Sequence, residues 1–327
     1  MPGQFLNYPF DEEVFLGLWR DEPDPTFTSI IESGALITND VINGMIPINS
    51  PQWTLPYYSP LGGTLQNYDG QTDMVTTETS AKYQSGTVYS RMKGWNDRDF
   101  IYDFHGADPM SAIVRKVSHY HNRERQARLL GIANAVFGIT GNAEWDKHTV
   151  NTGAEISPTD INYVSATALG QNSNILNLAL MHPIVAMQLQ NQQLLEFIKY
   201  TDARGMERNT NVAQIGDLTV VVSDDMPVSG TDYTTYLFGT GAFMYANSGV
   251  KVPVEVQRDG KTNGGQEELL TRIREVIHPN GFNFKYQASM GESPLDAALF
   301  NPANYELVFE ANAIPMAKLV TTFAPIP

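Results

Sequence analysis

Two glycine-rich stretches have spacings that occur in ligand-binding loops. In LFGTGAFMY, Gly239 and Gly241 follow a predicted strand, as they would in a loop that cradles a dinucleotide. Such a loop needs a third glycine at position 244, and Met244 occupies it. We therefore interpret both glycines as turn or bulge residues.

The stretch DGKTNGGQEELL has part of the pattern of a calcium loop, with Asp259 at its first position, Asn263 at its fifth and Gly264 at its sixth. The twelfth position requires a glutamate that binds through both oxygens, and Leu270 is there. Lys261 places a positive charge at the third position, where a ligand belongs. We interpret this stretch as a surface hairpin loop.

The histidines and acidic pairs do not form a recognisable catalytic or metal site. His119 and His121 are two residues apart on a predicted helix, so their side chains point about 200° apart and do not chelate one ion from the same face. His182 and His278 each precede a proline, which indicates structural junctions, and His105 and His148 are scattered. The pairs Asp224–Asp225 and Glu267–Glu268 fit a turn and a helix start.

The remaining catalytic signatures are missing from the sequence. It contains no Gly-x-Ser-x-Gly and no His-Glu-x-x-His motif. It has no cysteine, which excludes disulfides, thiolate metal sites and cysteine nucleophiles. We predict no catalytic, cofactor-binding or metal site, and we predict that the protein is not an enzyme.

The composition argues against tight nucleic-acid binding and for a surface covered by other subunits. The formal net charge is −15, and an acidic chain repels phosphate backbones. Charged residues make up 17 % of the chain, against about 25 % in typical proteins. The acidic N-terminus lacks the pattern of a signal peptide, and no run of about 18 apolar residues indicates a membrane helix. We expect a soluble protein made in the cytoplasm.

The element that dominates the secondary-structure prediction is a helix over residues 108–137. Asp108 suits the N-cap, Pro109 the first helical position, and Gly138 a left-handed residue after the last turn. The helix would run for about 29 residues and roughly 43 Å, well over twice the usual length of about 11 to 12 residues. An apolar stripe predicts a buried face, formed by Met110, Ile113, Val114, Val117, Tyr120, Leu129, Leu130, Ile132, Ala133, Val136 and Phe137.

The opposite face of this helix is basic. Only Glu124 balances five positive side chains, which are Arg115, Lys116, Arg123, Arg125 and Arg128. The face either pairs with acidic neighbours or meets a negatively charged partner.

The composition of residues 44–95 predicts an extended β-hairpin loop, and this loop has too few apolar residues to form a core of its own. It is either a surface loop or an arm that docks on a neighbouring subunit. On the second interpretation its candidate inter-subunit contacts are Trp53, Tyr57, Tyr58, Tyr68, Lys82, Tyr83 and Tyr89.

From residue 174 the pattern becomes α/β. Strands are predicted at 175–181, 217–227 and 233–246, with helices at 183–199 and 264–281 and closing strands within 301–323. The fold class is therefore α+β, with a long helix and extended hairpin beside a compact α/β region.

This order of parts resembles the major capsid proteins of tailed phages, which have the Hong Kong 97-type fold. The resemblance rests on an ordered set of stretches: INGMIPINSPQW, YSRMKGWNDRDF, ADPMSAIVRKVSHYHNRERQARLLGIANAVF, MHPIVAMQL, GDLTVVVSDDMP, YTTYLFGTGAFMY, EVIHPNGFNF and NPANYELVFEANAIPMAKLVT. Together they cover nearly the whole chain and are similar to coat proteins of phages of Gram-positive hosts.

The resemblance implies a division into parts. Residues 1–43 would be an N-terminal arm, 44–95 the extended loop, 96–154 a peripheral domain with the spine helix, 155–300 an axial domain, and 301–327 a return to the peripheral domain. Pentamers and hexamers of the chain would form an icosahedral shell in the virion around double-stranded DNA. The five basic residues would then face the lumen and touch packaged DNA weakly, without sequence preference.

The resemblance also implies partners besides the chain itself. Some relatives carry a cleaved scaffold segment before the loop. Since the loop here begins by about residue 46, we expect a separate scaffolding protein, together with a portal. Some relatives cross-link through a lysine in this loop. Lys82 and Lys93 match by location only, so no cross-link is predicted, and binding of a decoration protein stays open.

Two other functions remain as alternatives. An encapsulin-like compartment would use the same fold to hold a cargo enzyme. An α/β enzyme of unknown substrate would leave the coreless loop without an explanation.

Overall fold

The computed structural model describes residues 50–58, 64–68, 81–99, 109–192, 195–201, 207–215 and 218–323, with short pieces or single positions between 4 and 44 and between 71 and 76. Most of the predicted N-terminal arm thus lies outside the described residues. Of it, β1 (Gln4–Phe5) pairs with β2 (Tyr8–Pro9), and β3 (Leu36–Thr38) joins a sheet of the body.

The predicted long helix is confirmed as α5 (Pro109–Phe137). Its C-terminal half packs into the main core, where Leu129, Ile132 and Val136 are fully buried. Gly138 is not in the left-handed conformation that the sequence predicts, which Gly141 adopts instead. A side chain at Gly138 would meet Pro302, so the close approach of that proline accounts for this glycine.

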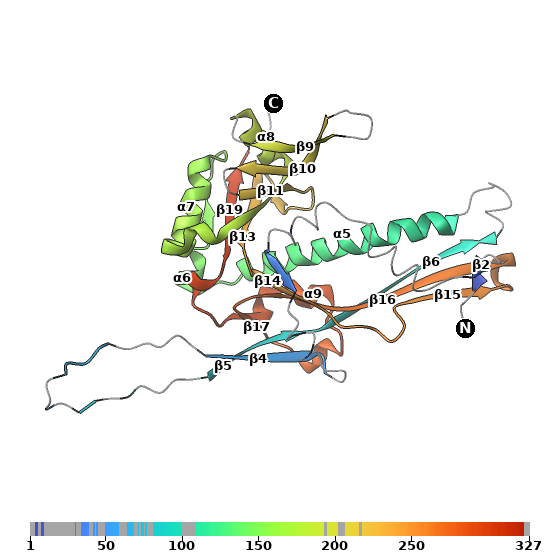
Figure 1. The fold of residues 1–327 in the computed structure, drawn as a ribbon, viewed down its shortest axis with the longest axis horizontal. Coiled ribbons are helices and arrows are strands. Elements are labelled where there is room, and N and C mark those ends of the chain that lie inside the picture. The colour runs from blue at the N-terminus through green and yellow to red at the C-terminus, as the bar shows by residue number, and fades with distance from the viewer. Residues whose placement is uncertain are drawn as a thin grey trace.

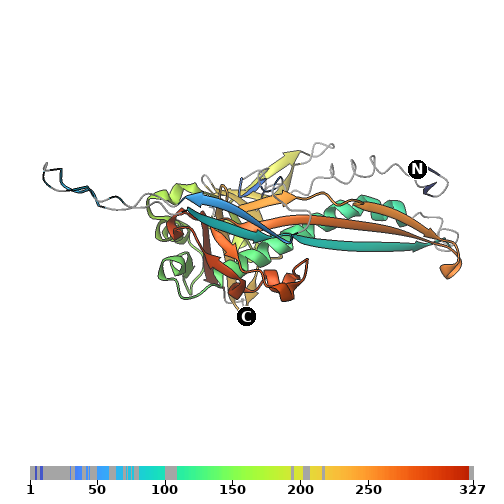
Figure 2. The ribbon, with the colours of Figure 1, turned by 90° about the horizontal axis from the view of Figure 1, so that it is seen from below.

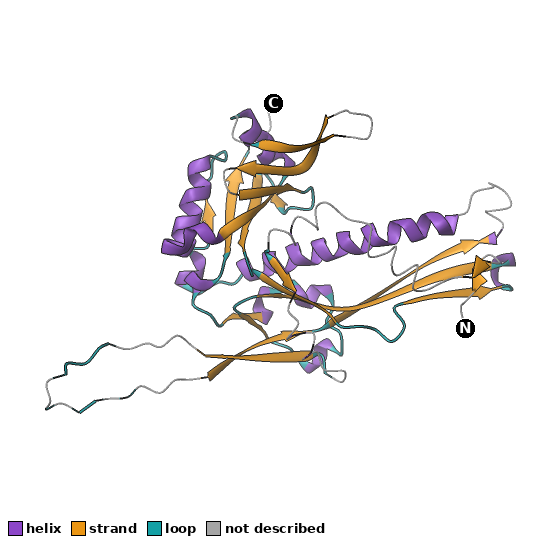
Figure 3. Ribbon diagram, in the orientation of Figure 1, coloured by secondary structure: helices purple, strands orange, loops and turns teal. Residues whose placement is uncertain are grey.

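A compact α/β unit stands on one side of α5 (Figures 1 and 3). Its eight-stranded sheet has β12 (Val228–Ser229) beside β13 and otherwise the order β7 (Thr149–Asn151), β19 (Met316–Thr322), β13 (Asp232–Gly239), β8 (Leu176–Met181), β11 (Leu218–Val222), β10 (Glu207–Ile215) and β9 (Glu196–Thr201). Helices α7 (Pro158–Leu169) and α8 (Pro183–Asn191) cover one face, and α5 packs on the other.

Alternating residues of the central strands serve these two faces. Leu178 and Leu180 of β8 belong to the core shared with α5, whereas Ala179 and Met181 pack under α7 and α8. The strand predicted at 175–181 and the helix that begins at Pro183 are confirmed. That helix ends at Asn191, eight residues earlier than predicted, because the following residues pair with β10 as β9.

A second, long sheet lies along α5 (Figures 1 and 2). It contains β6 (Tyr89–Arg98), β15 (Val254–Asp259), β16 (Gln266–Pro279), β14 (Phe243–Asn247) and β3. The helix predicted at 264–281 is therefore wrong. Glutamate, leucine and arginine favour a helix locally, but β16 buries alternate residues and is held between β6 and β15.

The extended hairpin is shorter than predicted. Among the described strands, β4 (Gln52–Tyr58) and β5 (Ala81–Thr87) pair only with each other, and they project from the body at the lower left of Figure 1. Residues 89–98, which the prediction included mostly in the loop, form β6 of the long sheet. Short elements complete the body: α6 (Ala143–Asp146), β17 (Phe282–Phe284), α9 (Asp296–Leu299) and β18 (Tyr305–Leu307).

Some strands also belong to another sheet than the division into peripheral and axial ranges, inferred from the resemblance, would place them in. Strands β14, β15 and β16 fall within the predicted axial range 155–300, yet they pair in the sheet alongside α5. Strand β19 falls within the predicted peripheral range 301–327, yet it pairs with β13 and β7 in the eight-stranded sheet.

Candidate assembly surfaces

The root of the β4–β5 hairpin is fixed to its own chain by Trp53. This side chain is 2 % exposed, and its ring meets the ring of His278 edge to face at 5.0 Å between centroids. Across the strand pair it lies over Gly86, where a Cβ atom would overlap the indole. The glycine thus gives the tryptophan the room to close over the neighbouring strand.

Polar contacts strengthen this attachment. The Tyr57 hydroxyl donates to the carbonyl of Val308 at 3.0 Å, and its ring packs on Phe309 with 4.6 Å between centroids. On β5, the Ser85 N–H donates to Asn283 Oδ1 at 2.8 Å. Both strands of the root are therefore anchored, so the hairpin leaves the body in a defined direction.

Beyond the root, the hairpin exposes large side chains. Tyr58 and Tyr83 are 77 % and 60 % exposed, and Leu65, Tyr68 and Met74 are more exposed still. Exposed aromatic and apolar side chains gathered on one projecting element are typical of a protein–protein contact.

A buried ionic cluster joins α5 to the long sheet. Glu275 of β16 is completely buried, and its carboxylate accepts from Arg125 Nε at 2.8 Å and pairs with Arg128 at 3.5 Å. The hydroxyls of Tyr89 and Tyr245 donate to the same carboxylate at 3.3 and 3.4 Å. Burial, and then Glu275, raise the pKa of Tyr245 to about 12, so its hydroxyl stays a donor.

The cluster continues to the surface through Asp296 at the start of α9. Its carboxylate pairs with Arg91 of β6 at 2.5 Å and with Arg128 at 3.4 Å. The guanidinium groups of Arg91 and Arg128 also lie over the Tyr89 ring, at 5.2 and 5.5 Å from its centroid. Five elements (α5, β6, β14, β16 and α9) are thus joined by this cluster.

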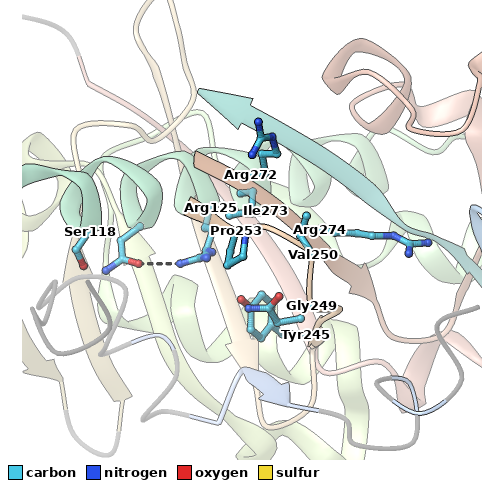
Figure 4. Close-up of a pocket in the computed structure, with 11 residues that line it drawn as sticks. Ser118, Arg125, Tyr245, Gly249, Val250, Pro253, Arg272, Ile273 and Arg274 are labelled. Carbon is cyan, nitrogen blue, oxygen red and sulfur yellow. Dashed lines mark hydrogen bonds between the residues drawn. The ribbon is translucent and has the colours of Figure 1, made fainter. Parts of the chain in front are cut away.

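A cavity of about 630 Å³ opens beside this cluster, between α5 and the β14–β15 connection (Figure 4). On its α5 side Arg125 donates to Asn122 Oδ1 at 3.1 Å. Its described lining consists of Ser118, Asn122, Arg125, Tyr245, Asn247, Gly249, Val250, Pro253, Arg272, Ile273 and Arg274. The polar side chains among them are hydrogen-bonding and cationic, and they are not arranged as a nucleophile with a base.

Comparison with known proteins decides what this fold is. No protein-family model matches the sequence. The chain is 30 % identical over 298 residues to the major capsid protein of Bacillus phage SPP1, which covers 89 % of this chain and 90 % of that protein. The chain belongs to the phage major capsid proteins. The predicted resemblance to coat proteins of phages of Gram-positive hosts is confirmed, since Bacillus is such a host.

Solved structures share the capsid fold at much lower identity. The capsid of the native GTA particle superposes with a TM-score of 0.54 at 10 % identity, covering 92 % of both chains. The cyanophage Pam1 capsid gives 0.55 at 10 % identity over 85 % of this chain and 86 % of that one. The capsid of Ralstonia phage GP4 gives 0.52 at 12 % identity over 91 % and 92 %. The predicted α+β phage capsid fold is confirmed.

The predicted hairpin contacts of this capsid protein fall into three groups. Trp53 and Tyr89 are buried in their own chain, so the prediction that they contact a neighbour is wrong. Tyr57 is half-buried and bonded to Val308 within the chain. Four exposed side chains remain as predicted inter-subunit contacts: Tyr58, Tyr68, Lys82 and Tyr83.

The predicted basic face of α5 is also divided. Arg128 is buried and Arg125 is half-buried, and both pair with Glu275 in the ionic cluster, so they do not belong to an exposed face. Lys116 is exposed, and Arg123 is 77 % exposed with Asp225 at 3.9 Å. The side chain of Arg115 lies outside the described residues. The sequence did not indicate that Glu275 is the partner of Arg125 and Arg128. Glu275 lies on β16, and the composition of this segment predicts a helix instead of a strand.

The stretches with ligand-loop spacings have structural roles. Gly239 ends β13 at a shift in strand register, and Gly241 lies in the turn to β14, where its N–H donates to the Gly34 carbonyl at 2.8 Å. The Asp259 stretch joins β15 to β16, and this carboxylate accepts from the Lys261 N–H at 2.9 Å. Both interpretations are confirmed. Among the described residues no group of three or more histidines and acids is placed to hold a metal ion.

The described histidines lie where the sequence indicates, with His119 and His121 pointing apart and His182 and His278 at structural junctions. His119 is exposed whereas His121 is buried, so they point apart. His182 caps α8 by accepting from the Ile184 N–H, and His278 bonds to the Phe282 carbonyl at 2.8 Å. His105 lies outside the described residues. In the part of the chain that the structure describes, no helix has both the length and the apolarity of a membrane span.

Two buried histidines predict a loss of stability in acid. Burial lowers the pKa of His278 from 6.5 to about 4, and burial followed by the charges of Arg125 and Arg128 does the same for His121. Below pH 6.5 the unfolded chain binds a proton at each histidine, while the folded chain does so only near pH 4. Stability is therefore complete above this window and falls within it by about 1.4 kcal/mol per pH unit for each histidine.

Urea unfolding at several values between about pH 7 and pH 4.5 measures this slope. In His278→Gln the slope should decrease by about 1.4 kcal/mol per pH unit, because the group that titrates in the unfolded chain has been removed. An unchanged slope in this variant would contradict the assignment.

Proposed function

We propose that this capsid protein self-assembles through pentamers and hexamers into the icosahedral shell that encloses the double-stranded DNA of a tailed phage. The observation that carries the proposal is the match to a phage major capsid protein along nearly the full length of both chains. The protein accordingly resides in the virion, and its role is structural rather than catalytic.

Within the shell, α5 acts as the spine of the peripheral part, together with the long sheet, and the eight-stranded unit is the axial part. The β4–β5 hairpin overlaps a neighbouring subunit. Its fixed root and the exposed Tyr58 and Tyr83 support this role. Many copies of a modest contact then stabilise a closed shell through multivalency.

Assembly uses a separate scaffolding protein and a portal. One chain must occupy both five-fold and six-fold positions, so subunit contacts by themselves permit several curvatures, and a template selects one of them. The portal supplies the single vertex through which DNA enters.

Negative-stain electron microscopy after size-exclusion chromatography tests the proposed function. The full chain, expressed alone and together with the structural genes of its own genome, should give rings, tubes, sheets or shells. A chain that stays monomeric in both preparations contradicts a capsid role. Particles that enclose a protein cargo in place of DNA would instead support the compartment alternative.

The exposed basic residues of α5 give a prediction about the genome. We propose that Lys116 and Arg123 meet packaged DNA weakly, since both are exposed on the spine helix. The double variant Lys116→Gln/Arg123→Gln should form normal shells that release DNA at lower salt. The slope of log K for DNA binding against log salt concentration should become shallower by about 0.9 for each lost phosphate contact. A matched control neutralises Lys147 and Lys285, which are also exposed. Equal retention in both double variants would rule out the lumen contact.

A further inference from the structure

One face of the eight-stranded unit carries almost no charge. The run from Ile156 to Gln192 contains no lysine or arginine, and Asp160 is its only carboxylate. This run forms α7, a 3₁₀ segment (Gly170–Ile175), β8 and α8. Over the whole chain 17 % of residues are charged, so this depletion is local.

The one carboxylate and the one imidazole of the run make hydrogen bonds inside it. Asp160 Oδ2 accepts from the Ser157 N–H at 2.9 Å, which caps the start of α7. His182 Nδ1 accepts from the Ile184 N–H at 3.2 Å, and burial lowers the pKa of this imidazole, which favours its neutral form. The single carboxylate is thus committed to a helix cap.

The helices of this run bury one apolar side against the sheet, and they also expose apolar side chains on the side that faces away from it. Ile161, Val164 and Leu189 are buried against the sheet. Facing outward, Tyr163 is 62 % exposed, and Ile175 and Met187 are 44 % and 43 % exposed. Figures 1 and 3 show α7 on the side of the sheet opposite α5, with its outer surface uncovered by the other described elements.

This surface has the composition of an interface core. Such cores are depleted in charged residues and enriched in tyrosine and methionine, and an exposed aromatic side chain is the usual anchor. Around Tyr163 the exposed residues of the run are small or carry amides, namely Asn162, Ala166, Gln171 and Asn172.

We infer that the outer surface of α7, with the 3₁₀ segment and α8, is the contact of this chain with a second copy of itself. The inference rests on the proposed function and names a partner surface within it. Each copy carries a net charge of −15, so two copies repel unless they meet through surfaces without unpaired charge. A highly charged partner, such as DNA, would find no opposite charge here.

In a ring of five or six copies the contact is head to tail, so this face meets a different surface of the next copy. The test therefore uses a photoreactive side chain at position 163, which cross-links to any surface that contacts it. A photoreactive benzoylphenylalanine replaces Tyr163 in the full chain, and assembled particles are irradiated. We expect covalent products with twice the mass of one chain, and multiples of it.

A charge variant measures whether the face drives assembly. Ala166 lies one turn from Tyr163 on α7 and is exposed, so Ala166→Glu should fold normally but reduce the yield of assembled particles about tenfold or more, because the carboxylate would be buried unpaired. Ala297→Glu, on the exposed side of α9 beside charged groups, is the matched control and should assemble normally.

The outcomes separate this inference from the proposed function. Copy-to-copy cross-links together with lost assembly in Ala166→Glu alone support the inference. Particles that carry benzoylphenylalanine at position 163 and form without such cross-links, or that cross-link only to another protein, overturn it and leave the capsid function standing. Normal assembly of Ala166→Glu overturns it as well. Failure of the wild-type chain to assemble under any condition overturns the proposed function itself.

Discussion

Replacing Glu275 by glutamine is expected to lower the free energy of unfolding by about 3–5 kcal/mol. The carboxylate is completely buried and balances the guanidinium groups of Arg125 and Arg128. Glutamine has a similar shape but no charge, so the buried Arg128 and the half-buried Arg125 would lose their main counter-ion. Asp296 and Glu124 lie close to Arg128 but are partly exposed, and they compensate only in part.

Urea unfolding at pH 7 measures this cost, with Glu306→Gln as the matched control. Glu306 pairs with Lys285 at 3.5 Å, and both side chains are more than half exposed. Exposed pairs of this kind contribute about 0–1 kcal/mol. If both variants unfold at the same urea concentration as the wild type, the buried cluster does not hold the spine helix to the sheet.

The second large effect is expected from two substitutions of Trp53. Trp53→Ala should cost about 3–5 kcal/mol, because it leaves a cavity among the buried Val88, Met244 and Val276 at the hairpin root. Trp53→Phe should cost less than about 1.5 kcal/mol, since the ring contact with His278 is kept. The indole N–H makes no hydrogen bond within the described structure, so its removal leaves no acceptor unpaired.

Hydrogen exchange of β4 and β5, followed by electron microscopy, separates local from global effects. In Trp53→Ala we expect faster exchange in these strands than in α5, and fewer assembled particles, because a hairpin with a loose root must be ordered when it binds a neighbour. Protection of β4 and β5 equal to that of the wild type would show that Trp53 does not anchor the hairpin. Trp53→Phe should retain both protection and assembly.

Much of the architecture follows from local sequence features. Pro109, the absence of any later proline and the apolar stripe through Leu129, Ile132 and Val136 are sufficient to predict α5. The apolar run 175–181 and Pro183 likewise predict β8 and the start of α8. These signals act over a few residues and depend on local backbone geometry and on the period of apolar side chains, so they can be recognised in a single sequence.

The assembly surfaces were only partly predictable. The projecting hairpin and its exposed tyrosines were predicted, but the burial of Trp53 and Tyr89 was not, because their partners lie far along the chain. For the same reason the arginines of α5 were predicted as one face, and only the fold divides the exposed Arg123 from the buried Arg128.

Strand β16 shows most clearly why contacts between distant residues were not predictable from the sequence. Its residues suit a helix as well as a strand, and the choice is made by hydrogen bonds to β6 and β15. Once β16 is a strand, every second side chain faces α5, which places Glu275 against Arg125, 150 residues away in sequence. The sequence by itself determined the long helix, the hairpin and the class of fold. Strand register and buried charge pairing depended on contacts between distant residues, and only the tertiary structure decided them.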